Sequence, residues 1–116
     1  MNKEIILTYL AAIIDSRGFV DITRNHQYRV FFNITEKDLE YWEKVVELFE
    51  EIGIEAKRYP KNLEDGRKKG RLREYQIYIG RKEQVVKLLD MIKDYSLKKE
   101  YYEKIIEKLL KKSRFQ

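Results

Sequence analysis

The chain has 116 residues, with 25 Lys and Arg against 20 Asp and Glu and a formal net charge of +5. This length fits a single domain, residues 1–116, and the basic excess is compatible with nucleic acid or an acidic membrane as a partner. The absence of Cys excludes disulfides and thiolate metal sites, and a single histidine, His26, argues against a zinc site or a Ser-His-Asp triad.

No apolar run approaches the roughly 18 residues that a membrane helix needs, and the N-terminus lacks a secretory signal pattern. We therefore expect a cytoplasmic, intracellular protein with no membrane partner. Lys and Glu are used heavily and Pro occurs once, which resembles the composition of thermophile proteins.

Helical and strand patterns alternate along the chain in the order αββ-αββ-αα. Thr35 is a candidate N-cap for the second helix, and Gly18 and Gly53 follow the ends of the first two helices. The predicted helices are 3–16, 35–52, 82–93 and 97–112, and the predicted strands are 19–24, 28–34, 54–60 and 71–79. In the last helix, the side chains expected to face inward are Leu97, Tyr101, Ile105, Leu109 and Leu110.

The first helix is apolar around nearly its whole circumference, whereas a surface helix should keep a polar face. Thr8, Ala12 and Ser16 are spaced four apart and form a stripe of small residues, which lets two helix backbones approach closely. This pattern predicts a homodimer with these three residues at its interface. The alternative is that the helix lies at the centre of a monomer core.

Residues 10–18 read LAAIIDSRG and resemble the LAGLIDADG motif of homing endonucleases. The segments Ile34–Leu39 and Tyr75–Ile79, and then Tyr95–Lys99, are similar to later segments of that family. The resemblance implies an α+β fold of the αββαββα type, with an antiparallel saddle sheet over the DNA major groove and C-terminal helices. It also implies that a chain with one motif pairs its motif helices in a dimer.

In the family that this chain resembles, the last acid of the motif holds the catalytic divalent metal, Mg²⁺ as a rule. That position is Arg17 here, and a guanidinium cannot ligate Mg²⁺. We therefore expect no cofactor and an impaired nuclease, with Arg17 free to contact a phosphate; the alternative is an exposed cation favoured by the helix dipole. Asp15 and Asp21 are weak candidates for a displaced acid, and Mg²⁺ would be needed if either one serves.

The strand faces predicted to point away from the core carry side chains that can pair with base edges or phosphates. Such faces are also common as ordinary solvated surfaces. Strands of seven residues span about 23 Å, so each subunit could cover roughly seven base pairs of a pseudo-palindromic site. The candidate DNA-binding residues are Arg17, Asp21, Thr23, Asn25, Gln27, Arg29, Asn33, Lys57, Tyr59, Arg67, Lys68, Lys69, Arg71, Gln76 and Tyr78, with Arg58, Lys61 and Arg73 as further phosphate contacts.

Four functions compete on this sequence. The leading hypothesis is a sequence-selective double-stranded DNA-binding homodimer with a degenerate active site. An active, metal-dependent homing endonuclease that uses a displaced acid is the alternative. An RNA maturase and a plain protein-interaction module are further possibilities.

Overall fold

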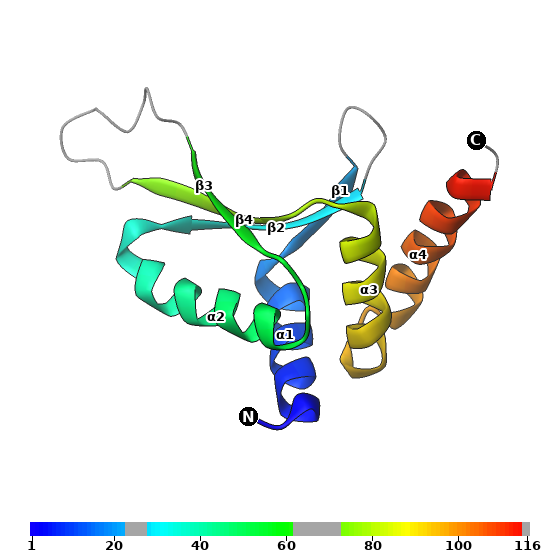
Figure 1. Ribbon diagram of the computed structural model, residues 1–116, viewed down its shortest axis with the longest axis horizontal. Helices are drawn as coiled ribbons and strands as arrows, with labels where there is room; N and C mark the ends of the chain where they lie inside the picture. The colour runs from blue at the N-terminus through cyan, green and yellow to red at the C-terminus, as the bar shows by residue number, and fades with distance from the viewer. Residues whose placement is uncertain (23–27, 62–72, 115–116) are drawn as a thin grey trace.

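The computed structural model describes residues 1–22, 28–61 and 73–114, which form an antiparallel sheet with helices on one side (Figure 1). The sheet order is β1-β2-β4-β3, and the opposite side of the sheet, here called the free face, is concave in this view (Figure 1). The strands are β1 (Phe19–Ile22), β2 (Tyr28–Thr35), β3 (Lys57–Lys61) and β4 (Glu74–Ile79). The helices are α1 (Lys3–Arg17), α2 (Leu39–Glu51), α3 (Lys82–Ile92) and α4 (Lys99–Arg114), with 3-10 turns η1 (Glu36–Asp38) and η3 (Lys93–Tyr95).

The helix α1 begins at an N-cap and ends against the sheet. The Asn2 side chain accepts a hydrogen bond of 2.8 Å from the Glu4 amide. At the other end, the Gly18 amide donates to the carbonyls of Ile13 and Ile14. A Cβ atom on Gly18 would lie 2.9 Å from both the Ile14 oxygen and the Phe32 ring, so glycine lets the helix end approach β2 closely.

The core lies between the sheet and the helices. On β2, Val30, Phe32 and Ile34 alternate with free-face residues and are buried. The Phe32 ring lies 5.0 Å from Trp42 of α2 and 6.2 Å from Phe49, measured between ring centroids. These aromatic contacts fix α2 against the centre of the sheet.

The predicted fold class and the order of elements are confirmed, but the start of the second helix is wrong. Thr35 makes no capping hydrogen bond and is instead the last residue of β2, paired with Glu74. The Glu36 amide continues that pairing by donating to the Arg73 carbonyl at 2.9 Å. The chain therefore turns through η1 before α2 begins at Leu39.

The third strand starts later than predicted. The Ile54 amide donates to the Phe49 carbonyl at 2.9 Å, and the Glu55 amide donates to the Gln84 side chain at 2.7 Å. These bonds satisfy the two amides outside the sheet, so pairing begins only at Lys57. Gly53, at φ +79°, makes the turn between α2 and this segment.

The last helix buries a different set of side chains from the one that was predicted. Leu97 is fully exposed, at 100%, and Tyr101 and Leu110 are 49% and 48% exposed, contrary to prediction. Leu97 lies in the turn before α4, because its amide is bonded to Asp15. The helix begins at Lys99, and its buried side chains are Tyr102, Ile105 and Leu109.

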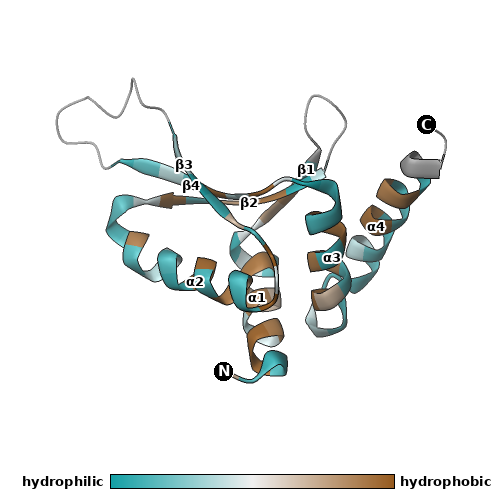
Figure 2. Ribbon diagram, in the orientation of Figure 1, coloured by the Kyte–Doolittle hydropathy of each residue, from teal (hydrophilic) through white to brown (hydrophobic). Residues whose placement is uncertain are grey.

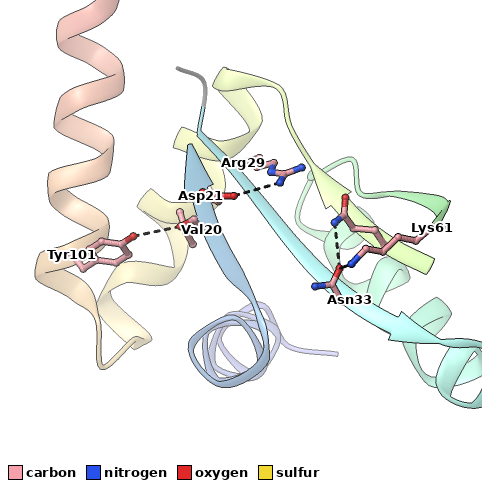
Figure 3. Close-up of polar contacts among 7 residues, drawn as sticks. Val20, Asp21, Arg29, Asn33, Lys61 and Tyr101 are labelled. Carbon is pink, nitrogen blue, oxygen red and sulfur yellow. Dashed lines mark hydrogen bonds and ion pairs between the residues drawn. The ribbon is translucent and has the colours of Figure 1, made fainter. Parts of the chain in front are cut away.

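The two edges of the sheet differ in how they end. On β3, all five residues are exposed, and Pro60 stands opposite Tyr75 of β4. On β1, the Tyr101 hydroxyl of α4 donates to the Val20 carbonyl at 3.4 Å (Figure 3). Helix α4 is thereby tied to the β1 edge.

Candidate nucleic-acid interface

The register of the strands brings polar side chains into rows across the free face. Asn33 of β2 stands opposite Gln76 of β4, and Gln76 stands opposite Tyr59 of β3. In the next row, Phe31 stands opposite Tyr78, which stands opposite Lys57. Alternation along each strand points these side chains away from the core, as predicted.

Three polar side chains from β2, β3 and β4 meet on this face. The Lys61 Nζ donates to Asn33 Oδ1 at 3.1 Å, and the Gln76 Nε2 donates to the same oxygen at 3.3 Å (Figure 3). We call Asn33, Lys61 and Gln76 the amide cluster. Gln76 is half-buried, whereas Asn33 and Lys61 are exposed.

Arg29 occupies a second polar site on the free face, toward β1. Its Nη2 lies 3.4 Å from Asp21 Oδ2 (Figure 3), and its guanidinium lies 4.4 Å from the centroid of the Phe31 ring. Phe31 is itself stacked on Phe19 at 5.1 Å, which explains why this outward residue is nevertheless buried. Among the described residues, none makes a hydrogen bond to the buried Arg29 Nε. The charge of Arg29 thus lies over an aromatic ring, with Asp21 as its ionic partner.

Two predicted contact residues have other partners. Arg58 points to the helix side of the sheet, where its Nη1 lies 2.8 Å from Glu43 Oε1 of α2 and its guanidinium covers the Tyr75 ring. Arg58 is therefore engaged on the helix side of the sheet, and its phosphate contact stays a prediction. Lys57 keeps its outward position beside Glu55, at 3.4 Å.

Several predicted contact residues lie outside the described part of the chain. They are Thr23, Asn25, Gln27, Arg67, Lys68, Lys69 and Arg71. The described residues alone place Asp21, Arg29, Asn33, Lys57, Tyr59, Gln76 and Tyr78 on one surface.

The end of α1 carries Arg17 near the sheet. This side chain is exposed, and its guanidinium lies 5.8 Å from the centroid of the buried Trp42 ring. Ser16 beside it donates to the Ala12 carbonyl at 2.7 Å. The sequence did not predict the contact between Arg17 and Trp42, because the two residues lie on different helices.

Asp15 is surrounded by hydrogen-bond donors. Ser96 Oγ lies 2.7 Å from Asp15 Oδ1 and 2.9 Å from Oδ2, and it donates to this carboxylate. The Tyr102 hydroxyl also donates to Oδ1 at 2.8 Å, and the Leu97 amide donates to Oδ2 at 2.9 Å. Burial and the bond to Asp15 raise the pKa of the Tyr102 phenol well above its ordinary value. The carboxylate therefore fastens α1 to the start of α4.

One side of α1 is exposed, although the helix carries apolar residues over successive turns (Figure 2). We define the α1 stripe as Ile5, Thr8, Tyr9, Ala12 and Ser16, all exposed. The Thr8 hydroxyl is turned back to the Glu4 carbonyl at 2.7 Å, as Ser16 is to Ala12. Both hydroxyls are thus satisfied within the helix, and the stripe borders a shallow groove of 560 Å³ beside Tyr95.

A tyrosine pair joins α1 to α2 at the border of the stripe. The hydroxyls of Tyr9 and Tyr41 lie 2.8 Å apart. This hydrogen bond, with some desolvation, raises the pKa of Tyr41 to about 12. The pair was not predicted, because its members are 32 residues apart and neither belongs to a recognisable motif.

Within the described residues, no three His, Cys, Asp or Glu side chains lie together in a way that could hold a metal ion. In the same part of the chain, none of the helices has the length and apolar character to cross a membrane.

The described chain is an α+β domain of the αββαββ class, because its antiparallel sheet is covered by helices and follows a first helix whose outer side is exposed. The model of the LAGLIDADG-like domain matches residues 4–93, so the chain belongs to this family. No curated protein matches it.

Solved structures of homing endonucleases share the fold. I-CvuI with the I-CreI target, in 2 mM Mg and with the DNA not cleaved, aligns at a TM-score of 0.64 and 9% identity, covering 92% of this chain and 67% of that one. I-CvuI with its target Sro1.3 in 2 mM Ca aligns at a TM-score of 0.64 and 14% identity, covering 94% of this chain and 68% of that one. The archaeal intron-encoded I-Vdi141I complexed with DNA aligns at a TM-score of 0.51 and 19% identity, covering 87% of this chain and 64% of that one. At these identities the likeness is one of fold, and this chain spans about two thirds of the length of those proteins.

Proposed function

We propose that the protein is a sequence-selective, double-stranded DNA-binding homodimer that lacks the metal-dependent cleavage of its family. The observation that carries the proposal is the concave free face, which presents amides, phenols and cations in register and no described helix. These side-chain types donate to and accept from base edges in the major groove.

The dimensions of the sheet suit a duplex. The longest strand, β2, has 8 residues and extends about 27 Å, which matches roughly eight base pairs. Lys57 and Lys61, at the β3 edge, would contact phosphates and supply affinity that depends on salt. The homing endonuclease structures of similar fold are complexes with DNA, which supports DNA as the ligand of this chain.

The α1 stripe is the proposed homodimer interface. Its small side chains and internally bonded hydroxyls leave a surface on which a second copy of α1 can pack closely. A two-fold axis through this contact would place two sheets along one duplex and favour a pseudo-palindromic site.

The residues at the end of α1 do not fit a Mg²⁺ site. Mg²⁺ requires oxygen ligands, whereas Arg17 offers only donors and Asp15 already accepts from Ser96, Leu97 and Tyr102. Asp21 is engaged with Arg29 on the free face. Loss of cleavage with retained binding is therefore the proposed state, and no step of a metal mechanism is assigned to this chain.

The test is selection of bound sequences from a random duplex pool in EDTA, followed by incubation of the selected duplex with Mg²⁺. We expect selective, salt-dependent binding without strand breaks. Metal-dependent nicking lost in Asp21→Asn would instead establish an active endonuclease. Preference for a structured RNA over every duplex would establish a maturase-like role, and an absence of nucleic-acid affinity would leave a protein-interaction module.

A further inference from the structure

The amide cluster has a fixed hydrogen-bond polarity. An ammonium group only donates, so the Asn33 atom facing Lys61 Nζ at 3.1 Å is the amide oxygen. Gln76 contacts the same oxygen at 3.3 Å, and it must therefore present its Nε2 there. Lys61 thus determines the orientation of Asn33, and Asn33 determines that of Gln76.

The orientation determines what Gln76 can offer to a ligand. One N–H of its Nε2 is used by Asn33, which leaves its Oε1 as an acceptor and a second N–H as a donor. Within the described part of the chain, no hydrogen bond occupies this donor or this acceptor, and the two are adjacent on one planar amide. Gln76 lies on a central strand of the sheet, between Asn33 of β2 and Tyr59 of β3.

We propose that Gln76 recognises an adenine in the major groove, and that Asn33 and Lys61 are positioning residues that hold its amide for this contact. This inference rests on the proposed duplex-binding function. Adenine presents an N6 donor beside an N7 acceptor, which matches the acceptor and donor of Gln76. Guanine presents two acceptors at its edge, so its O6 would oppose Oε1, and the thymine O4 and methyl group offer no matching pair.

Aromatic residues neighbour Gln76 in the sheet. The Tyr59 and Tyr78 rings pack edge to face at a centroid distance of 5.9 Å, and Tyr59 stands directly opposite Gln76. The Gln76 amide is held by its hydrogen bond to Asn33, so it loses less freedom on binding than an unrestrained side chain would. The cluster is therefore organised before DNA arrives.

The experiment measures relative affinities for the selected duplex with all four base pairs substituted at each position. For the unmodified protein, we expect an A·T pair in each half-site at which substitution weakens binding by about tenfold or more. Gln76→Ala should abolish the preference at that pair alone. Gln76→Glu, which accepts without donating, should shift the preference toward cytosine, whose N4 donates.

A comparison of Lys61→Met with Lys57→Met separates the positioning role of Lys61 from the effect of losing one positive charge. Both remove one cation from the free face of β3, but only Lys61 donates a hydrogen bond to Asn33, whereas Lys57 lies beside Glu55. Both variants should lose affinity to a similar extent for every sequence, and only Lys61→Met should relax the preference at the adenine position. Asn33→Ala should relax the same position.

Each other outcome is decisive. If the preference at every position survives Gln76→Ala and Gln76→Glu, the adenine contact is wrong although selective duplex binding stands. If Lys57→Met and Lys61→Met behave alike, the positioning role is wrong. If the unmodified protein shows no selective duplex binding, the proposed function fails and this inference fails with it.

Discussion

Asp15 and Tyr102 are 87 positions apart in the chain, yet the Tyr102 hydroxyl donates to the Asp15 carboxylate at 2.8 Å. The same carboxylate accepts from the Ser96 side chain and from the Leu97 amide, so a single acid binds the segment that precedes α4 as well as Tyr102 within the helix. An acid of the sequence motif thus acts as a structural clamp.

Replacing Asp15 by Ala should lower the free energy of unfolding by about 2–3 kcal/mol, because partly buried donors lose a charged acceptor. Asp15→Asn, which keeps one acceptor, should cost less. Urea denaturation measures both changes. The control is Asp90→Ala, which removes an exposed carboxylate paired with the half-buried Lys93 and should change stability by less than about 1 kcal/mol. Equal losses in Asp15→Ala and Asp90→Ala would contradict the clamp.

The Tyr9–Tyr41 pair predicts a dependence on alkaline pH. The pKa of Tyr41 is raised from 10.0 to about 12, so the folded chain holds this proton more tightly than the unfolded chain does. The resulting stabilisation is complete below pH 10 and is lost as the pH rises from 10 to about 12. The difference in tyrosinate absorbance between the unmodified protein and Tyr41→Phe should report this titration. In Tyr9→Phe the same titration should move back toward pH 10; a titration that stays in place would assign the shift to another cause.

Gly18→Ala should destabilise the fold by about 1–3 kcal/mol through overpacking. The added methyl group would lie 2.9 Å from the Ile14 oxygen and 2.9 Å from the Phe32 ring, at a position where neither neighbour is a flexible chain end. Thermal unfolding measures the loss, with the exposed Lys37→Ala as a control. An unchanged melting temperature would show that α1 does not approach β2 so closely.

Ala12→Glu should convert the proposed dimer into a folded monomer. Two carboxylates would meet across the α1 stripe, whereas the exposed position of Ala12 leaves the protomer core intact. Sedimentation gives the mass, and affinity for a full pseudo-palindromic duplex should fall by about a hundredfold or more. Glu47→Lys, on α2 and outside the α1 stripe, is the control and should remain dimeric. A dimer that persists in Ala12→Glu would exclude this interface.

Arg17→Asp should restore a carboxylate at the helix end and allow Mg²⁺ to bind in the dimer, which calorimetry detects. Arg17→Asn is the matched control, because it removes the guanidinium without supplying a charged ligand. Both variants should change the fluorescence of Trp42, the only tryptophan, because both remove the cation 5.8 Å from its ring. If the heat of Mg²⁺ binding is absent from Arg17→Asp, or is equal in Arg17→Asp and Arg17→Asn, residue 17 does not lie at the metal-binding position of the dimer.

The sequence predicted the order of the elements and the outward side chains of the sheet well, because inward and outward side chains alternate on β2 and β4, with the outward but buried Phe31 as the exception to the polarity pattern. Asn33 and Gln76 could be assigned to one face from their own strands. Their contact could not be predicted, because it depends on the β2–β4 register, in which strands far apart in sequence become neighbours.

The predictions were wrong where a local sequence pattern competed with hydrogen bonds to residues that are distant in the chain. Thr35 has the character of an N-cap, but pairing with Glu74 keeps it in the sheet. Leu97 is apolar and near a helix start, but the bond of its amide to Asp15 turns its side chain to solvent. In both places a backbone group that is satisfied elsewhere outweighs the local pattern.

The edges of the sheet bear on how copies of the chain can associate. An uncovered strand edge invites another strand to pair with it, and proline and lysine discourage such pairing. On β3, Pro60 offers no amide and Lys57 and Lys61 add charge, while on β1 the Val20 carbonyl already accepts from Tyr101. Pairing with a further strand is therefore disfavoured at both edges of the described sheet, which is consistent with the proposed association through the α1 stripe.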